Sequence, residues 1–462
     1  MEPEHLRFGG GATETTLTPV VAVLLLIAIV LILTRPREKL IAVFLLSCLC
    51  IPIGQVMVLG TLHFPVVRIL VIAGLIRRAI ERRTLSAGKF PGGFNPIDRM
   101  VVLWSVSACV ILTLQWMDTG MLIHELGDLL DTLGGYLVFR FLIPDGEAVR
   151  RTVKVLAVIC VIHGAGMINE QISHVNVFGY LGGTATWVTI RDGQIRSQDV
   201  MGCIQAGSFA GALIPPFLWL WTKGKSRLLG AAGLAGATAM VITSHSSTPL
   251  LAFCGSFVGL AFWPLRKQMR LVRWGIVGLL VSLHIVMKAP VWALINHIDL
   301  TGSSSGYHRF VLMDNCIRHF SDWWLLGYKY YNAWGWDMWD LCNQFVVCAL
   351  TGGLLTLVCY ITVISRSFGA LGKARKKVDG DRSQEWLLWA LGSALFATVV
   401  AHFGINYMTQ LMMGFFPVLC CISVASFEAS KAVVPRVESP SEAQLAYGAG
   451  VASANLPLDA VM

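Results

Sequence analysis

The sequence predicts an all-α fold, a polytopic transmembrane helix bundle of about 12 to 14 spans, on three observations. Hydrophobic residues make up 55% of the 462 residues and charged residues only 14%, with a mean hydropathy of +0.66. Apolar runs such as 20–33, 153–167, 228–242 and 386–400 approach the roughly 20 residues that cross a bilayer. Basic residues gather in alternate connections between these runs. A soluble class is therefore excluded, and the net charge of +9 reports topology rather than a nucleic-acid partner.

The chain begins with a short segment, residues 1–16, that we expect outside the membrane. It carries three glutamates against Arg7 alone, whereas a cleavable signal peptide needs a basic segment before its apolar core. The next apolar run ends at Arg35-Pro36-Arg37, which is typical of a stop-transfer flank. The first span is therefore expected to stay in the membrane.

The transmembrane domain is predicted over 17–427. Its predicted spans are 17–34, 40–58, 64–76, 100–115, 120–143, 153–169, 203–221, 228–243, 248–265, 274–288, 344–365, 386–402 and 408–427. With the N-terminus outside, the inside segments and the tail hold 26 of the 36 Lys and Arg residues, as the retention of basic residues in the cytoplasm requires. We therefore expect a bacterial inner membrane protein whose C-terminal residues, 428–462, form a disordered cytoplasmic tail.

Two connections on the predicted outer side are much longer than the others, a medium loop at 170–202 and a large loop at 289–343. Long loops on a bundle with tight turns are more often functional sites than spacers. The first loop contains Arg191 and Arg196, just before a span rich in small residues. Each arginine has two interpretations: a fork for two oxygens of a lipid pyrophosphate, or a contact with lipid headgroups or with an aspartate of the same loop.

The second loop is predicted to contain a short helix after a serine-rich start at 302–306. One face of this helix would carry an apolar stripe made of Phe310, Met313, Ile317 and Phe320. Arg309 lies beside the stripe and is expected to point toward the protein. The tryptophans that follow fit either an interfacial belt or stacking surfaces for sugar rings. Cys316 and Cys342 leave a disulfide open.

Ionisable residues inside the predicted spans need partners, because an isolated charge in lipid is costly. Asp128 and Asp131 are three residues apart and share a helix face. Arg68 is the candidate partner for one of these aspartates, and a proton or ion pathway through the same residues is the alternative. Arg140 is the fourth charge of this kind.

Several motifs follow one another in the second half of the chain. They are Arg196 before the small-residue run 202–211, the turn Thr243-Ser244-His245-Ser246-Ser247, Tyr307-His308-Arg309 with Phe320-Ser321-Asp322-Trp323-Trp324-Leu325-Leu326-Gly327, and Asp340-Leu341-Cys342-Asn343-Gln344-Phe345 leading into Gly352-Gly353-Leu354-Leu355. In their order around one large loop, over residues 190–365, they resemble the superfamily of bacterial O-antigen ligases and O-antigen polymerases.

This resemblance implies an enzyme that transfers a glycan from a polyprenyl-pyrophosphate carrier to an acceptor hydroxyl at the outer face of the inner membrane. Arg196, Arg309 and Arg191 would bind the pyrophosphate and stabilise its negative charge as it leaves. The acceptor would be a growing glycan or a lipid-linked core sugar, and no cofactor is expected. No metal-binding pattern was recognised, so no metal ion is expected either.

The candidate catalytic residues are Asp340, His308 and Asn343, and Asp340 or His308 would deprotonate the acceptor. Cys342 occupies the place of a family-typical histidine, and a neutral thiol is a poor base near pH 7. Ligase and polymerase chemistry therefore stay equally open. The alternative function is a transporter or flippase of a lipid-linked glycan or small solute that works through the charges inside the spans.

Overall fold

The computed structural model describes residues 14–84, 90–297, 305–335 and 337–431. The chain is 75% helical with almost no sheet, which confirms the predicted all-α polytopic bundle. Among the described residues, seven helical segments are long and apolar enough to cross a membrane: α4 (Pro96–Trp116), α7 (Gly146–Ser173), the pair α8 (Cys203–Ala212) and α9 (Ile214–Thr222), α12 (Met269–Val286), α15 (Gln344–Lys377), α16 (Arg382–His402) and α17 (Thr409–Lys431). The protein is therefore a multi-pass membrane protein.

The remaining predicted spans also coincide with helices. Three are shorter apolar helices, α1 (Pro19–Thr34), α10 (Arg227–Thr243) and α11 (Ser247–Ala261). The others are α2 (Arg37–Cys50), α3 (Val66–Thr84) and the run formed by α5 (Thr119–Leu129), η1 (Leu130–Gly134) and α6 (Gly135–Leu142). Every predicted span thus has a helical counterpart. That the shorter helices also cross the membrane stays a prediction.

The second span was predicted to continue to residue 58, and this boundary is wrong. Helix α2 ends at Cys50, and β1 (Val56–Leu59) pairs antiparallel with β2 (Leu62–Pro65). Pro52 interrupts the helix because proline has no N–H to donate. The fully buried Gln55 side chain then accepts a hydrogen bond from the backbone N–H of Thr18 at 2.8 Å and donates to the Leu181 carbonyl at 3.0 Å. These bonds hold the hairpin against the start of α1.

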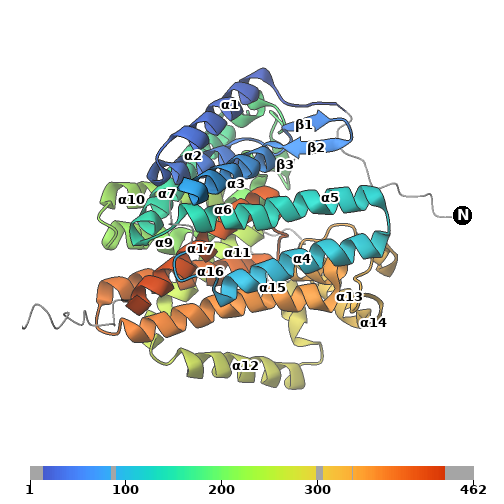
Figure 1. Ribbon diagram of the computed structural model, residues 1–462. Coiled ribbons are helices and arrows are strands. Elements are labelled where there is room, and N and C mark those ends of the chain that lie inside the picture. The colour runs from blue at the N-terminus through green and yellow to red at the C-terminus, as the bar shows by residue number, and fades with distance from the viewer. Residues whose placement is uncertain (1–13, 85–89, 298–304, 336, 432–462) are drawn as a thin grey trace, which may run out of the picture.

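The two long connections lie at the same end of the bundle as the β1–β2 hairpin, on the right in Figure 1. The first contains η2 (Val177–Leu181) and the hairpin of β3 (Thr189–Arg191) and β4 (Gln194–Arg196). The second contains η4 (Val291–His297), α13 (Ser305–Arg318), α14 (Phe320–Trp323) and η5 (Tyr331–Trp334). We call this the loop end of the bundle. Most of the predicted N-terminal segment, 1–13, and most of the tail, 432–462, lie outside the described residues, but α17 continues to Lys431, beyond the predicted limit of 427.

Helix α15 is broken where the second connection packs against it. Gly353 has φ +63° and ψ −170°, a conformation outside the helical region. The backbone N–H of Leu354 donates to the Trp324 carbonyl at 2.8 Å, and the N–H of Tyr328 donates to the Leu350 carbonyl at 2.8 Å. The segment around 324–328 therefore replaces hydrogen bonds that the break removes from the helix.

The opposite end of the bundle contains a buried ion pair that accounts for Arg140. Its guanidinium is fully buried and donates to Asp98 through Nε at 2.8 Å and through Nη2 at 3.1 Å. Tyr136 donates its hydroxyl to the same carboxylate at 2.5 Å. Asp98 also forms a capping box with Asn95 at the start of α4. This arginine is a packing element that joins α4 to α6.

Candidate active site

Both long connections are attached to one short turn at the loop end, the turn 243–248 between α10 and α11. On one side, the backbone N–H of Ser197 donates to the Thr243 carbonyl at 3.1 Å. On the other, Nη2 of Arg309 donates to the Thr248 hydroxyl at 2.8 Å, and this hydroxyl donates to the Gly404 carbonyl at 3.2 Å. The segment that carries Arg196 and the helix that carries Arg309 therefore meet the same few residues.

Arg309 lies on the buried face of α13, where only 4% of it is exposed. The expected direction of this arginine is confirmed, but the predicted apolar stripe is not the buried face. Ile317 is 47% exposed, whereas Leu312 and Cys316 are buried. Positions 309, 312 and 316 follow helical spacing, so the guanidinium takes the place of an apolar residue in the packed face. Phe320 belongs to α14 rather than to α13.

His308, the neighbour of Arg309 in the chain, lies against Asp340. The His308 Nε2 atom is 2.9 Å from the Asp340 carbonyl oxygen. Because a carbonyl only accepts hydrogen bonds, Nε2 carries the proton in this arrangement. The other ring nitrogen, Nδ1, is 3.8 Å from a carboxylate oxygen of Asp337. Asp340 is exposed, so its carboxylate can be reached from outside the bundle.

Cys342 and Cys316 both carry free thiols, so the disulfide left open by the sequence is not formed. Burial raises the pKa of Cys342 to about 12, and the negative charges of Asp340 and Asp337 act in the same direction. Burial likewise raises the pKa of Cys316 to about 12. The neutral thiol of Cys342 is therefore a poor base and a poor nucleophile near pH 7.

Asn343 has a structural use that its sequence position did not reveal. It is the N-cap of α15, and its Oδ1 accepts hydrogen bonds from the backbone N–H groups of Phe345 at 2.9 Å and Val346 at 3.3 Å. Its neighbour Gln344 accepts from the backbone N–H of Tyr407 at 2.6 Å. Both side chains are buried. Capping occupies the amide oxygen of Asn343, and a catalytic role for this residue stays a prediction.

The two arginines of the first connection differ in their surroundings. Arg191 lies at the end of β3, is half exposed and has its Nε 3.7 Å from the Asp192 carboxylate, the aspartate pairing weighed from sequence. Asp192 and Gly193 form the turn with positive φ angles of 52° and 74°, as a two-residue hairpin requires. Arg196 on β4 is partly buried, and its Nε has no hydrogen-bond partner within the described part of the chain. Arg196 is therefore the better placed of the two for an anion.

The buried network that fixes the residues after Arg196 was not predicted from the sequence. His163 of α7 pairs through Nδ1 with the Asp199 carboxylate, and both are fully buried. Glu170, also fully buried, accepts hydrogen bonds from the backbone N–H groups of Gln198 and Asp199 at 3.0 and 3.3 Å. A histidine inside a predicted span and a glutamate directly after it were the signal in the sequence. This network holds the first connection against α7.

No family model matches this chain, and no curated protein matches it. The resemblance to O-antigen ligases and polymerases is therefore carried by the motifs alone. The candidate site that this resemblance indicates consists chiefly of Arg309, His308 and Asp340.

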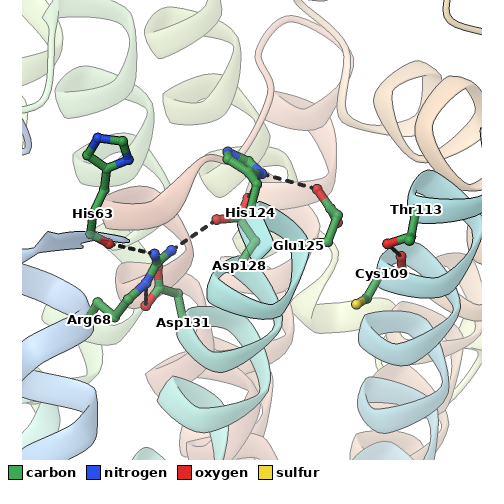
Figure 2. A network of polar contacts seen from close by, with 8 residues as sticks. All are labelled: His63, Arg68, Cys109, Thr113, His124, Glu125, Asp128 and Asp131. Carbon is green, nitrogen blue, oxygen red and sulfur yellow. Dashed lines mark hydrogen bonds and ion pairs between the residues drawn. The ribbon is translucent and has the colours of Figure 1, made fainter. Parts of the chain in front are cut away.

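The charges inside the spans form a second polar network, shown in Figure 2. Arg68 of α3 pairs with Asp131 at 2.7 Å and with Asp128 at 3.2 Å, and it donates through Nη1 to the His63 carbonyl at 2.9 Å. This is the internal pairing expected from sequence. His124 and Glu125 extend the network along α5, with His124 Nδ1 3.3 Å from Glu125 Oε1.

Two groups of side chains bring potential metal ligands within 4.8 Å of one another among the described residues. One is His308, Asp340 and Cys342, beside Arg309, and the other is His124, Glu125 and Asp128. Neither set was recognised as a pattern in the sequence. The first depends on a fold that joins α13 to the start of α15, which no local motif encodes.

Proposed function

We propose that this protein transfers a glycan from a polyprenyl-pyrophosphate carrier to an acceptor hydroxyl at the loop end of the bundle. The acceptor oxygen attacks the anomeric carbon of the donor sugar and forms the new glycosidic bond. The bond between that carbon and the phosphate oxygen breaks, and the pyrophosphate leaves with the electron pair. The acceptor proton passes to a base on the protein. We place this reaction at the outer face of a bacterial inner membrane, with lipids around the bundle.

The proposal depends chiefly on one observation, the buried Arg309 at the loop end, whose neighbour in the chain, His308, contacts Asp340. A guanidinium offers five donors in a fixed plane and fits two phosphate oxygens at once. A pyrophosphate bound there gains negative charge as it leaves, so a preorganised cation stabilises the transition state more than the ground state. Arg196, whose segment joins the same turn, is the second cation proposed for the leaving group.

Asp340 and His308 are the proposed bases. With the proton of His308 on Nε2 and donated to the Asp340 carbonyl, Nδ1 keeps its lone pair and can accept a proton from a hydroxyl. The Asp337 carboxylate, 3.8 Å away, would stabilise the imidazolium that results. Asp340 itself offers an exposed carboxylate for the same task. Cys342 takes no part as a base, because burial keeps its thiol neutral.

The test is release of undecaprenyl pyrophosphate by purified protein supplied with a lipid-pyrophosphate glycan and a candidate acceptor. Arg309→Ala should lower the rate roughly a hundredfold to a thousandfold, the usual effect of removing one well-placed donor. Arg309→Lys keeps the positive charge and loses the planar guanidinium, so its rate should lie between those of wild type and Arg309→Ala. The matched control is Arg318→Ala, because Arg318 lies on the same helix, is 72% exposed and pairs with Asp314 at 2.6 Å. It should keep wild-type activity.

Two results would overturn the proposal. The first is an absence of acceptor-dependent release from protein whose fold is verified by thermal unfolding. The second is an Arg309→Ala variant as active as Arg318→Ala. Either result favours the transport alternative, whose supporting observation is the network of Arg68, Asp128 and Asp131 in Figure 2.

A further inference from the structure

The network in Figure 2 contains a group of three potential metal ligands on α5 that does not belong to the site described above. His124 and Asp128 are four residues apart and therefore share one face of the helix. The His124 Nδ1 atom is 3.9 Å from Asp128 Oδ2 and 3.3 Å from Glu125 Oε1. One imidazole and two carboxylates thus converge from a single turn and a half of helix.

These distances suit a tetrahedral metal ion. Zinc binds histidine nitrogen and carboxylate oxygen at about 2.0 to 2.2 Å, which places neighbouring ligand atoms roughly 3.4 Å apart. The separations of 3.3 and 3.9 Å lie close to that value, and all three ligand atoms lie within 4.8 Å of one another. A bound ion would replace the hydrogen bond between His124 and Glu125.

A second layer of contacts already orients one ligand. Arg68 donates to Oδ1 of Asp128 at 3.2 Å, so the other oxygen, Oδ2, is left facing His124. Arg68 is itself fixed by Asp131, at 2.7 Å, and by the His63 carbonyl, at 2.9 Å. Supporting contacts of this kind hold a metal ligand in place and contribute to affinity. The π-helical turn η1 follows directly, and such turns are frequent at functional sites.

The charge of the network also matches a divalent cation. Arg68 pairs with Asp128 and Asp131, and Glu125 pairs with His124, so the network contains three carboxylates and one guanidinium. An excess of carboxylates is costly in an apolar bundle. A divalent ion would neutralise it. His124 and Asp128 are 47% and 53% exposed, so an ion can reach the ligands and keep an open position for water.

We propose that His124, Glu125 and Asp128 bind a divalent transition-metal ion of the zinc type. The other ligand group is less suitable, because the Arg309 cation acts on Cys342 and would oppose a second positive charge there. The proposed site is separate from the glycan-transfer site. Its test measures metal binding directly and needs no enzymatic activity.

Purified full-length protein, stripped of metal with a chelator, is titrated with Co²⁺ and Zn²⁺. Wild type should bind one ion per chain, develop the visible absorption of tetrahedral cobalt and unfold at a higher temperature with Zn²⁺. His124→Ala and Asp128→Asn should weaken binding more than about a hundredfold, since each removes a direct ligand. Arg68→Gln should weaken it about 10- to 100-fold as a supporting residue. Asp128→Asn keeps the shape of the side chain, which guards against a variant that fails to fold.

The matched controls are His319→Ala and His308→Ala. His319 forms a similar exposed pair with Asp322, at 3.2 Å, but has no third ligand among the described residues. Both controls should bind as tightly as wild type. The proposal is overturned if folded wild type binds no ion, if the His124 and Asp128 variants bind as well as wild type, or if His308→Ala alone abolishes binding.

Discussion

Replacement of Gly353 by alanine tests whether the break in α15 is built into the fold. Gly353 has φ +63° and ψ −170°, a region that residues with a Cβ almost never adopt. A Cβ at this position would also lie 2.6 Å from the Leu325 carbonyl oxygen and 3.1 Å from that of Trp324. These carbonyls belong to the segment whose backbone bonds to α15 through Leu354 and Leu350. Alanine therefore strains the backbone and pushes this segment away.

The expected destabilisation follows from these two effects. A non-glycine residue in this backbone region costs about 1 to 3 kcal/mol. The close approach to backbone carbonyls adds to that cost, because backbone atoms cannot rotate aside as a side chain does. Gly353→Ala should therefore lower the free energy of unfolding by at least about 2 kcal/mol.

Thermal unfolding in detergent, followed by the fluorescence of a thiol-reactive dye, measures this change. The matched control is Gly372→Ala on the same helix, where an added Cβ meets nothing within 4 Å and the backbone is helical. Alanine at an unhindered helical position is favoured over glycine by about 0.5 to 1 kcal/mol, so the control should unfold at the same or a higher temperature. If both variants shift the unfolding temperature equally, the break in α15 is not fixed by Gly353 and the reasoning is refuted.

Three further predictions concern the buried polar groups. Asp98→Asn leaves the Arg140 charge buried without its ionised partner, so the free energy of unfolding should fall by about 3 to 5 kcal/mol in the same assay. An unchanged free energy of unfolding would contradict the buried ion pair. Asn343→Ala should cost about 1 kcal/mol by removing the cap of α15, and Asn343→Ser should recover most of it; equal losses would show that capping is not the cause. The pKa of Cys342 is raised from 9.0 to about 12, so its thiolate fraction at pH 8 is about a thousandfold below that of an ordinary thiol. Mass spectrometry should therefore find Cys342 unmodified by iodoacetamide in folded protein and labelled after denaturation.

The sequence by itself determined the class and the order of the helices. Apolar runs of bilayer length have to form helices, because lipid offers no partner for backbone N–H and C=O groups. For the same reason the expected partner of Arg68 could be named, since an aspartate of another predicted span was the least costly partner for an arginine inside a span. The inward direction of Arg309 also followed from its place in a partly apolar segment.

Only the tertiary structure decided how residues far apart in the chain meet. No local pattern indicated that Arg309 would donate a hydrogen bond to Thr248, since 61 residues separate them. The predicted stripe on α13 was wrong because the burial of a helix face depends on what packs against it, here the start of α15. The role of Asn343 as a cap, the docking of 324–328 into the break at Gly353 and the convergence of His308 with Asp340 have the same origin. Hydropathy fixes which segments enter the membrane, whereas the polar contacts of a site depend on distances that only the packed bundle sets.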